Sequence, residues 1–249
     1  ANVDNLGALL GEVERIAQKH ASLGITAEQY PLVGAALLQA IQEVLNPPAE
    51  IISAWAKGYE LLSGVFIARE AEIYQQKAEQ AGGWRQTRPF NVVEKQQESE
   101  LVTSFYLSPQ DGKPIADARP GQYIAVYLDD TGCNHRQIRQ YSLSGSNRDD
   151  LYRISVKREL NKSVAESVSN YLHSSVAVGD TLAVSNPFGD FHLQESDKPV
   201  VLISGGVGIT PMQGMLETLV AEGSNREIHF VHGTLNRSQH SFSKRLQEL

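Results

Sequence analysis

The segment Val200-Val-Leu-Ile-Ser-Gly-Gly-Val-Gly-Ile-Thr-Pro211 indicates the fold class of the C-terminal part of the chain. Its first residues, 200–204, form an apolar run that ends at a serine, which is typical of a strand buried on both faces. A glycine-rich turn follows, and the pattern then predicts a helix over 211–222 that begins at proline and is capped by Thr210. Because a further strand is expected over 228–231, this part begins an α/β domain.

The glycine-rich turn also predicts a ligand. It follows a strand and precedes a helix, and its glycines let the backbone approach a pyrophosphate that the helix N-terminus attracts. The candidate contacts are Gly205, Gly206, Val207, Gly208, Ile209, Thr210 and Pro211. The spacing differs from Gly-x-Gly-x-x-Gly, so a turn without a ligand is the alternative. Neither a P-loop nor a Gly-x-Ser-x-Gly elbow occurs, which argues against phosphoryl transfer and serine hydrolysis.

The middle of the chain has the alternating pattern of β-structure. Short apolar runs of period two are separated by Pro, Gly, Asp and Asn from residue 90 onward. The expected strands are 90–95, 101–107, 123–128, 140–144, 152–157 and 181–185. Their even spacing predicts an antiparallel β-barrel.

Within this region, Arg139-Gln-Tyr-Ser142 has a pattern suited to a flavin. Along a strand Arg139 and Tyr141 share one face, so a guanidinium can meet a diphosphate while a ring meets an isoalloxazine. Gln140 lies between them and Ser142 adds a short hydroxyl. Downstream, the helix start in Val168-Ser-Asn-Tyr-Leu-His173 offers backbone N–H groups to phosphate. Taken alone, the four-residue pattern also fits an ordinary strand.

Residues 5–81 have the period of helices instead. Apolar positions recur every three or four residues from Asn5, and a second helix is expected after Thr26, which has the capping-box spacing to Gln29. Two prolines end that helix, and a third helix is expected over residues 49–79. The sequence therefore predicts an all-α segment of three helices.

Each of these helices carries one polar residue on its apolar stripe: His20, Tyr30 and Glu70. A buried glutamate is costly unless it is hydrogen-bonded, so we expect the three side chains to meet in a shared interior. A metal-ligating histidine needs such partners, because the bond at its second nitrogen sets the tautomer. Spacing alone favours an ordinary polar core cluster over a metal site.

Composition limits the remaining classes of protein. The chain has 249 residues, of which 41% are hydrophobic and 20% charged, as expected for about two globular domains. A net charge of −7 without basic runs argues against nucleic acid or an anionic membrane as partner. The single Cys133 excludes a disulfide framework within the chain and a cysteine-based metal site. No apolar run is long enough to span a membrane, and we expect a cytoplasmic protein.

The pattern changes suggest where the domains divide. We expect an α-helical domain over 1–81, a β-domain over 82–195 and the start of the α/β domain over 196–249. The chain begins without Met, and its last residues have the pattern of a helix that simply stops. We therefore expect a fragment.

The helical motifs resemble a known family. Val13-Glu-Arg-Ile-Ala-Gln-Lys-His20, Thr26-Ala-Glu-Gln-Tyr30 and Phe66-Ile-Ala-Arg-Glu-Ala-Glu-Ile-Tyr74 are similar to the proximal side of the globin domain of bacterial flavohaemoglobins. The resemblance implies that His20 is the proximal ligand of the haem iron. It also implies that Tyr30 and Glu70, as catalytic residues, give His20 imidazolate-like character, which favours oxygen activation over storage.

The same resemblance has two further implications for the haem. It places Lys19 between haem and flavin, where its charge eases electron transfer; a solvated helix residue is the alternative. The family's earlier helices, with a distal Tyr and Gln, have no counterpart in residues 1–5. The expected haem pocket is therefore about half complete.

The β-motifs resemble the FAD barrel of the ferredoxin-reductase superfamily, in order and spacing. These motifs are Pro120-Gly-Gln-Tyr123, Arg139-Gln-Tyr-Ser142, Val168-Ser-Asn-Tyr-Leu-His173 and Pro187-Phe-Gly-Asp-Phe191. The resemblance assigns Arg139 to the FAD pyrophosphate, Tyr141 to the flavin ring and Ser142 to the reactive flavin nitrogen. It makes Tyr123 a further flavin contact and places Ser169 and Asn170 at the phosphates. In that superfamily, the glycine-rich turn marks the nicotinamide-binding half.

A globin segment followed by a flavin reductase implies the activity of flavohaemoglobins. We expect an NAD(P)H-dependent nitric oxide dioxygenase that binds haem b, FAD and NAD(P)H and converts nitric oxide and dioxygen to nitrate, with no obligate protein partner. One alternative is a flavin reductase whose helical segment is a docking module without haem. The other is an oxygen-storing or oxygen-sensing globin whose reductase keeps iron ferrous.

Overall fold

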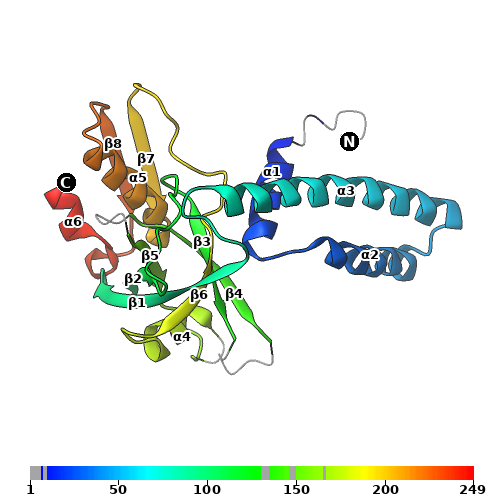
Figure 1. The fold of residues 1–249 in the computed structure, drawn as a ribbon, viewed down its shortest axis with the longest axis horizontal. Helices are drawn as coiled ribbons and strands as arrows, with labels where there is room; N and C mark the ends of the chain where they lie inside the picture. Colours follow the sequence, from blue (N-terminus) through cyan, green and yellow to red (C-terminus); the bar gives the residue numbers. More distant parts are fainter. Residues whose placement is uncertain (1–6, 8–9, 130–134, 146–149, 165–166) are drawn as a thin grey trace. The chain divides into compact units, whose positions relative to one another are not determined.

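A computed structural model describes residues 7, 10–129, 135–145, 150–164 and 167–249. The chain divides into two compact units, Ala1–Glu79 and Gln80–Leu249, which are described separately below (Figure 1). The expected helix start at Asn5 lies outside the described residues, as does Cys133.

The first unit is all-helical, as predicted. Its elements are α1 (Leu10–Ser22), η2 (Ala27–Gln29), α2 (Tyr30–Leu45) and α3 (Ala49–Glu79). The capping box is present, with the Thr26 N–H donating to Gln29 Oε1 at 2.9 Å. Asn46 ends α2 in a left-handed conformation with φ 42°, directly before the two prolines. The predicted bounds of α3 are confirmed.

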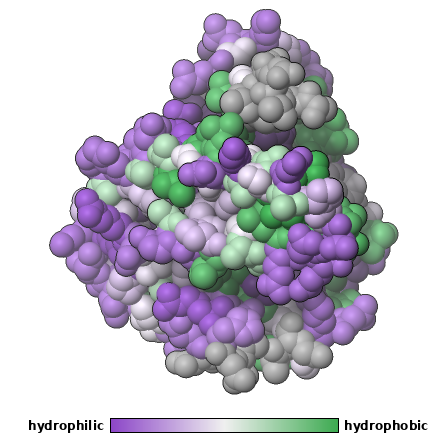
Figure 2. Space-filling model, turned by 90° about the vertical axis from the view of Figure 1, so that its right-hand side faces the viewer, coloured by the Kyte–Doolittle hydropathy of each residue, from purple (hydrophilic) through white to green (hydrophobic). Residues whose placement is uncertain are grey.

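The expectation that the apolar stripes of α2 and α3 are buried is largely wrong. Val33, Val44 and Trp55 are 59%, 80% and 53% exposed, and Leu62 is also at the surface. Within the described residues, α2 packs mainly on α3, so an apolar position facing away from that contact stays uncovered. Figure 2, turned by 90° from Figure 1, shows hydrophobic residues on the surface of the face that it presents.

The second unit begins with an antiparallel sheet whose strand order is β4-β3-β6-β1-β2-β5. The strands are β1 (Thr87–Gln97), β2 (Val102–Pro109), β3 (Tyr123–Leu128), β4 (Gln137–Ser142), β5 (Tyr152–Lys157) and β6 (Thr181–Ser185). Within the described part of the chain, an isolated bridge pairs Leu143, which follows β4, with Ile154 of β5. The predicted antiparallel fold is confirmed.

One strand is misplaced in the sequence prediction. β4 was expected over 140–144 but spans Gln137–Ser142; the Leu143 N–H still donates to the Gln122 carbonyl beside β3 at 2.9 Å, and the Ser144 N–H then donates to the Arg153 carbonyl of β5 at 2.9 Å. Gly145 then adopts φ +89°, which a side chain disfavours. Directly after the predicted flavin motif, the backbone therefore passes from pairing with β3 to pairing with β5.

The sheet encloses the main hydrophobic core of this unit. Phe90, Phe105 and Ile154 are fully buried, and Leu172 of α4 (Val168–Ser175) closes one end of the core. Each such side chain stabilises the fold by about 1.5–3 kcal/mol relative to exposure. Lys95 Nζ donates to the Val176 carbonyl at 2.6 Å and so fixes the C-terminal end of α4 on β1.

The chain ends in the predicted α/β arrangement. Its elements are β7 (Val200–Gly205), η3 (Gly206–Gly208), α5 (Ile209–Ala221), β8 (Ile228–Gly233), η4 (Arg237–Gln239) and α6 (Ser243–Glu248). β7 and β8 pair in parallel, with α5 connecting them (Figure 1).

The predicted cap of α5 is wrong. The helix begins at Ile209 with Gly208 as its N-cap, because η3 continues directly into α5. Thr210 therefore lies inside the first turn, where its Oγ1 donates to the Val207 carbonyl at 3.1 Å. Pro211 also lies after the first helical position.

Candidate functional site

The first candidate site lies in the helical unit, where three helices bring His20, Tyr30 and Glu70 together. His20 Nδ1 lies 2.8 Å from Glu70 Oε1 and 3.0 Å from Tyr30 Oη. The Tyr30 hydroxyl donates to the same Glu70 oxygen at 2.5 Å. We call these three residues the histidine triad. Glu70 is 2% exposed, so the triad holds its carboxylate almost entirely away from water.

The donor and acceptor roles in the histidine triad set the tautomer of His20. A carboxylate only accepts, and the Tyr30 proton is already donated to Glu70, so the hydrogen of a neutral imidazole lies on Nδ1. Nε2 then carries a lone pair, and none of the described residues hydrogen-bonds to it. Burial, together with the Glu70 carboxyl, raises the pKa of Tyr30, which keeps its hydroxyl a donor. The ring is thus prepared to ligate a metal through Nε2.

Packing holds the histidine triad in place. Phe66 lies beside the imidazole with ring centroids 5.8 Å apart, and Tyr59 donates to the Tyr30 carbonyl at 2.6 Å. Arg69 joins α3 to α1 through Glu14, with Nε 2.6 Å from Oε2. Within the described residues no group of three or more His, Cys, Asp or Glu is arranged to hold a metal ion. A single imidazole is sufficient for a metal ion whose remaining ligands are supplied by a prosthetic group.

Lys19 precedes His20 on α1 and is exposed. Its carbonyl accepts from the Ser22 hydroxyl at 2.7 Å, which belongs to the end of the helix. The proposed role of Lys19 in electron transfer stays a prediction.

The second candidate site is a cavity of about 930 Å³ in the second unit, which we call the cofactor cavity. It brings together three predicted motifs that are far apart in the sequence. Its lining includes Arg139, Gln140, Tyr141, Ser142, Ser169, Val207, Gly208, Thr210 and Pro211. The cavity therefore joins the β4 motif, the start of α4 and the glycine-rich turn.

The described residues that line the cofactor cavity carry an excess of positive charge, although the chain has a net charge of −7. Among them are the cations Arg139, Lys157, Arg158 and Lys162, against the single acid Glu159. Hydrogen bonds from Ser167 and Lys162 lower the pKa of Glu159. Such an excess of cations suits a diphosphate.

The aromatic wall of the cofactor cavity comes from Tyr141. Its ring packs against the core of the sheet, and burial raises its pKa. Arg139 is exposed and, among the described residues, donates to its own strand, to Ile138 O at 2.8 Å and Gln137 Oε1 at 3.3 Å. Its guanidinium is thus accessible from solvent beside a neutral phenol ring.

The start of α4 contributes Ser167 and Ser169, whose hydroxyls lie 2.9 Å apart. Asn170 is not among the residues that line the cavity, and its expected place at a phosphate stays a prediction. It is 3% exposed, and its amide binds Glu159 N, Glu159 O and Lys162 O at 2.6–2.9 Å. Asn170 therefore shapes the loop that supplies the cations.

Other predicted residues also lie outside the lining of the cofactor cavity. Tyr123 pairs with Phe188, and a Cβ at Gly189 would lie 2.8 Å from its ring, so Tyr123 packs against the backbone there. Ile209 is fully buried, because it anchors the start of α5. Gly205 ends β7, and Gly206 lines a smaller neighbouring pocket of about 370 Å³.

Sequence reasoning missed the cations that follow the flavin motif. Lys157 is the last residue of β5 and Arg158 follows it, and both line the cofactor cavity. Lys162, on the loop after them, lines it too. Adjacent basic residues at the end of a strand were the available signal. Among the described residues, no helix is both long and apolar enough to cross a lipid bilayer.

Three family models match the chain in succession. They are Globin over residues 1–66, Oxidoreductase FAD-binding domain over 89–193 and Oxidoreductase NAD-binding domain over 202–249. The histidine triad extends beyond the first match, at Glu70, and the cofactor cavity draws on the other two.

Two relatives match nearly the whole length of this chain. A flavohemoprotein of Bacillus cereus is 46% identical over 247 residues, which cover 98% of this chain and 61% of the relative. A flavohemoprotein of Oceanobacillus iheyensis is 47% identical over 252 residues, which cover 100% of this chain and 62% of the relative. The chain thus spans about three fifths of the length of these relatives.

Two solved structures are similar in fold as well. The crystal structure of a flavohemoglobin from Malassezia yamatoensis, with bound FAD and heme, gives a TM-score of 0.83 at 28% identity and covers 96% of this chain and 61% of that one. The FAD/NAD-binding domain of a nitric oxide dioxygenase from Vibrio cholerae gives a TM-score of 0.62 at 44% identity. The match covers 66% of this chain and 69% of that one.

Proposed function

Because this chain belongs to the flavohaemoprotein family, we propose that it is part of an NAD(P)H-dependent nitric oxide dioxygenase. The proposed cofactors are haem b, FAD and NAD(P)H, and the proposed substrates are nitric oxide and dioxygen. The observation that carries the proposal is the histidine triad, in a chain that also holds the cofactor cavity.

Haem fits the helical unit because of the chemistry of the histidine triad. Nδ1 of His20 is engaged by Glu70 and Tyr30, which leaves Nε2 with a lone pair for iron. The carboxylate raises the basicity of the ring, and a strongly donating axial ligand favours oxygen activation. Glu70 and Tyr30 orient the ligand without contacting a substrate.

FAD and NAD(P)H fit the second unit. We propose that Arg139 binds the pyrophosphate of FAD, that Tyr141 packs on the flavin ring and that Ser142 lies at its reactive edge. Ser169 and the N–H groups of α4 suit a phosphate, and Val207 to Pro211 suit the nicotinamide cofactor. Tyr123 and Asn170 support these segments from outside the cavity.

The chemistry proposed for the bound groups is hydride acceptance by FAD, transfer of single electrons to haem and reaction of nitric oxide with oxygen at the haem. The chain binds and orients these groups. We propose domain boundaries near residues 81 and 195, outside the matched FAD-binding region at 89–193. We also propose a cytoplasmic location, because the chain has one cysteine and a reducing compartment suits it.

The proposal is tested on the intact protein by absorption spectroscopy and nitric oxide consumption. We expect haem and flavin bands together, and nitrate formed from nitric oxide at the expense of NAD(P)H. Flavin bands without a Soret band would indicate a flavin reductase with a helical docking module. Intact oxygen binding with slow nitric oxide turnover would indicate an oxygen-binding or oxygen-sensing globin instead.

A further inference from the structure

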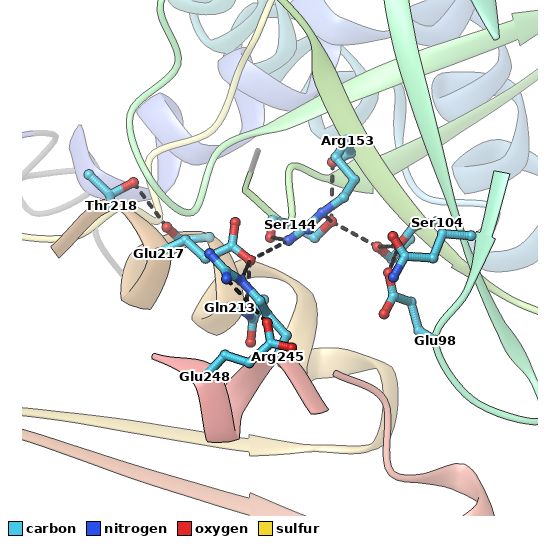
Figure 3. Close-up of polar contacts among 12 residues, drawn as sticks. Glu98, Ser104, Ser144, Arg153, Gln213, Glu217, Thr218, Arg245 and Glu248 are labelled. Atoms are coloured by element: carbon cyan, nitrogen blue, oxygen red, sulfur yellow. Dashed lines mark hydrogen bonds and ion pairs between the residues drawn. The ribbon is translucent and has the colours of Figure 1, made fainter. Parts of the chain in front are cut away.

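A buried ion pair joins the two halves of the second unit. Arg153 of β5 donates from Nη2 to Glu217 Oε1 of α5 at 2.9 Å, and the two side chains are 7% and 4% exposed. Gln213 Nε2 donates to the same oxygen at 2.9 Å, and Arg245 of α6 approaches it at 3.4 Å (Figure 3). The Glu217 carboxylate thus collects donors from β5, α5 and α6.

The same ion pair contacts the segment that follows the flavin motif. Arg153 donates from Nη2 to the Ser144 carbonyl and from Nε to the Ser144 hydroxyl at 3.1 Å. Ser144 comes two residues after Ser142, the last residue of β4. The guanidinium is therefore shared between the flavin-motif segment and Glu217 of α5.

Two glycines allow α5 to approach that segment closely. A Cβ at Gly214 would lie 2.7 Å from the Leu143 carbonyl oxygen, a distance that a real side chain does not tolerate. A Cβ at Gly145, where φ is +89°, would lie 2.6 Å from Glu217 Oε2. Helix α5 and residues 143–145 are thus in direct backbone contact, with the ion pair at its edge.

This contact connects two cofactor-binding segments. Residues 143–145 continue the flavin motif of β4, and α5 continues the glycine-rich turn. A shift at this contact therefore moves the flavin motif relative to the glycine-rich turn. We propose that Arg153 and Glu217 are positioning residues that hold the nicotinamide turn at the correct distance and angle from the flavin strand. This inference rests on the proposed function.

The chemistry of the pair supports positioning over simple stabilisation. A buried ion pair is often no more stabilising than apolar side chains of similar volume, because both charges lose their hydration. Its hydrogen bonds are directional, however, and fix an orientation that apolar packing does not. Hydride transfer is sensitive to such placement, since a displacement of about 1 Å costs roughly 100-fold in rate.

The test replaces the pair by apolar residues in the intact protein loaded with FAD. Arg153→Met with Glu217→Leu should keep the melting temperature and the FAD dissociation constant near those of the unsubstituted protein. Flavin reduction at saturating NAD(P)H should slow by about 10- to 100-fold. Hydrogen exchange should become faster in α5 and residues 143–145, a readout independent of turnover. Reduction by dithionite should stay unchanged.

The matched control is the exposed ion pair between Arg136 and Asp129, whose side chains are 55% and 59% exposed. Arg136→Met with Asp129→Leu should leave both flavin reduction and hydrogen exchange unchanged. If the buried double variant does not fold, Glu217→Gln is measured instead. It keeps the shape of the side chain but loses the charge that holds Arg153 and Arg245 on Glu217 Oε1, so we expect a slower reduction rate with FAD still bound.

Two results would overturn the inference. One is an unchanged rate and unchanged exchange in the buried double variant or in Glu217→Gln. The other is loss of FAD in proportion to the loss of rate, which would make the pair purely structural. Failure of the unsubstituted protein to bind FAD, or to be reduced by NAD(P)H, would instead refute the proposed function.

Discussion

Replacing Glu70 by Gln tests whether the histidine triad tunes a metal ligand. The amide oxygen still accepts from Tyr30 and from His20 Nδ1, so the two hydrogen bonds at 2.5 Å and 2.8 Å remain possible while the negative charge is lost. Glu70→Gln is therefore a change of charge with little change of shape. We expect haem to stay bound, with a weaker donor at Nε2.

The magnitude follows from the two bonds to Glu70. A hydrogen bond to a charged group contributes about 1.5–3 kcal/mol and a neutral one about 0.5–1.5 kcal/mol. Losing the charge therefore costs about 1 kcal/mol per bond, or about 2 kcal/mol for both. Because a neutral side chain is also cheaper to bury, this value is an upper bound on the loss of stability.

The assay is resonance Raman spectroscopy of the intact haem protein, with thermal unfolding alongside. The iron–histidine stretching frequency should fall, because a neutral amide draws less on the imidazole proton than a carboxylate. The control is Glu72→Gln, since Glu72 is 62% exposed and pairs with Arg69 at the surface of the same helix. An unchanged frequency in Glu70→Gln would refute the tuning role, and loss of haem would show that Glu70 is needed for binding itself.

Three further predictions address the ligand, the flavin and the pH dependence of stability. His20→Ala should abolish haem retention and leave FAD bound, as measured by the two absorption bands; haem at normal stoichiometry would contradict the ligand assignment. Tyr141→Ala with Ser142→Ala should weaken FAD binding and stop NAD(P)H from reducing the haem, while dithionite-reduced protein still binds oxygen; wild-type reduction would contradict the flavin assignment. Burial raises the pKa of Glu98 above its ordinary value of 4.5, against the opposing effects of its hydrogen bond from Ser104 and the charge of Arg153. The folded chain then holds that proton more tightly than the unfolded chain, so stability falls as pH rises from 4.5 through the folded pKa. Glu98→Gln should flatten this fall in urea unfolding, and an equally steep fall would contradict it.

The sequence predicted those parts of the fold that depend on local periodicity. The bounds of α3, β3, β5 and β6 follow from apolar spacing and from prolines and glycines, because each element buries one regular face. The convergence of His20, Tyr30 and Glu70 was also predictable, since a polar residue on an apolar stripe must find a partner inside.

Features that depend on tertiary context were not predictable. The amide of Asn170 satisfies backbone groups of a loop whose path the sequence does not define, while its expected place at a phosphate stays a prediction. Thr210 was expected as a cap, but the preceding turn is already helical, so Gly208 takes that position. The exposure of Val44 and Trp55 depends on which helices cover them, and a single stripe does not contain that information.

The histidine triad and the Arg153–Glu217 ion pair each use one buried carboxylate oxygen as an acceptor for donors from different elements. Glu70 Oε1 accepts hydrogen bonds from His20 and Tyr30, which lie on two other helices. Glu217 Oε1 accepts hydrogen bonds from Arg153 and Gln213. Burying a carboxylate is costly, so apolar residues would be the simpler way to pack either position. An apolar residue cannot fix the orientation of an imidazole or a guanidinium, whereas an oxygen that accepts several directional bonds does. The cost of burial therefore fits a requirement for orientation: of the proposed metal ligand in the helical unit, and of the two proposed cofactor segments in the other.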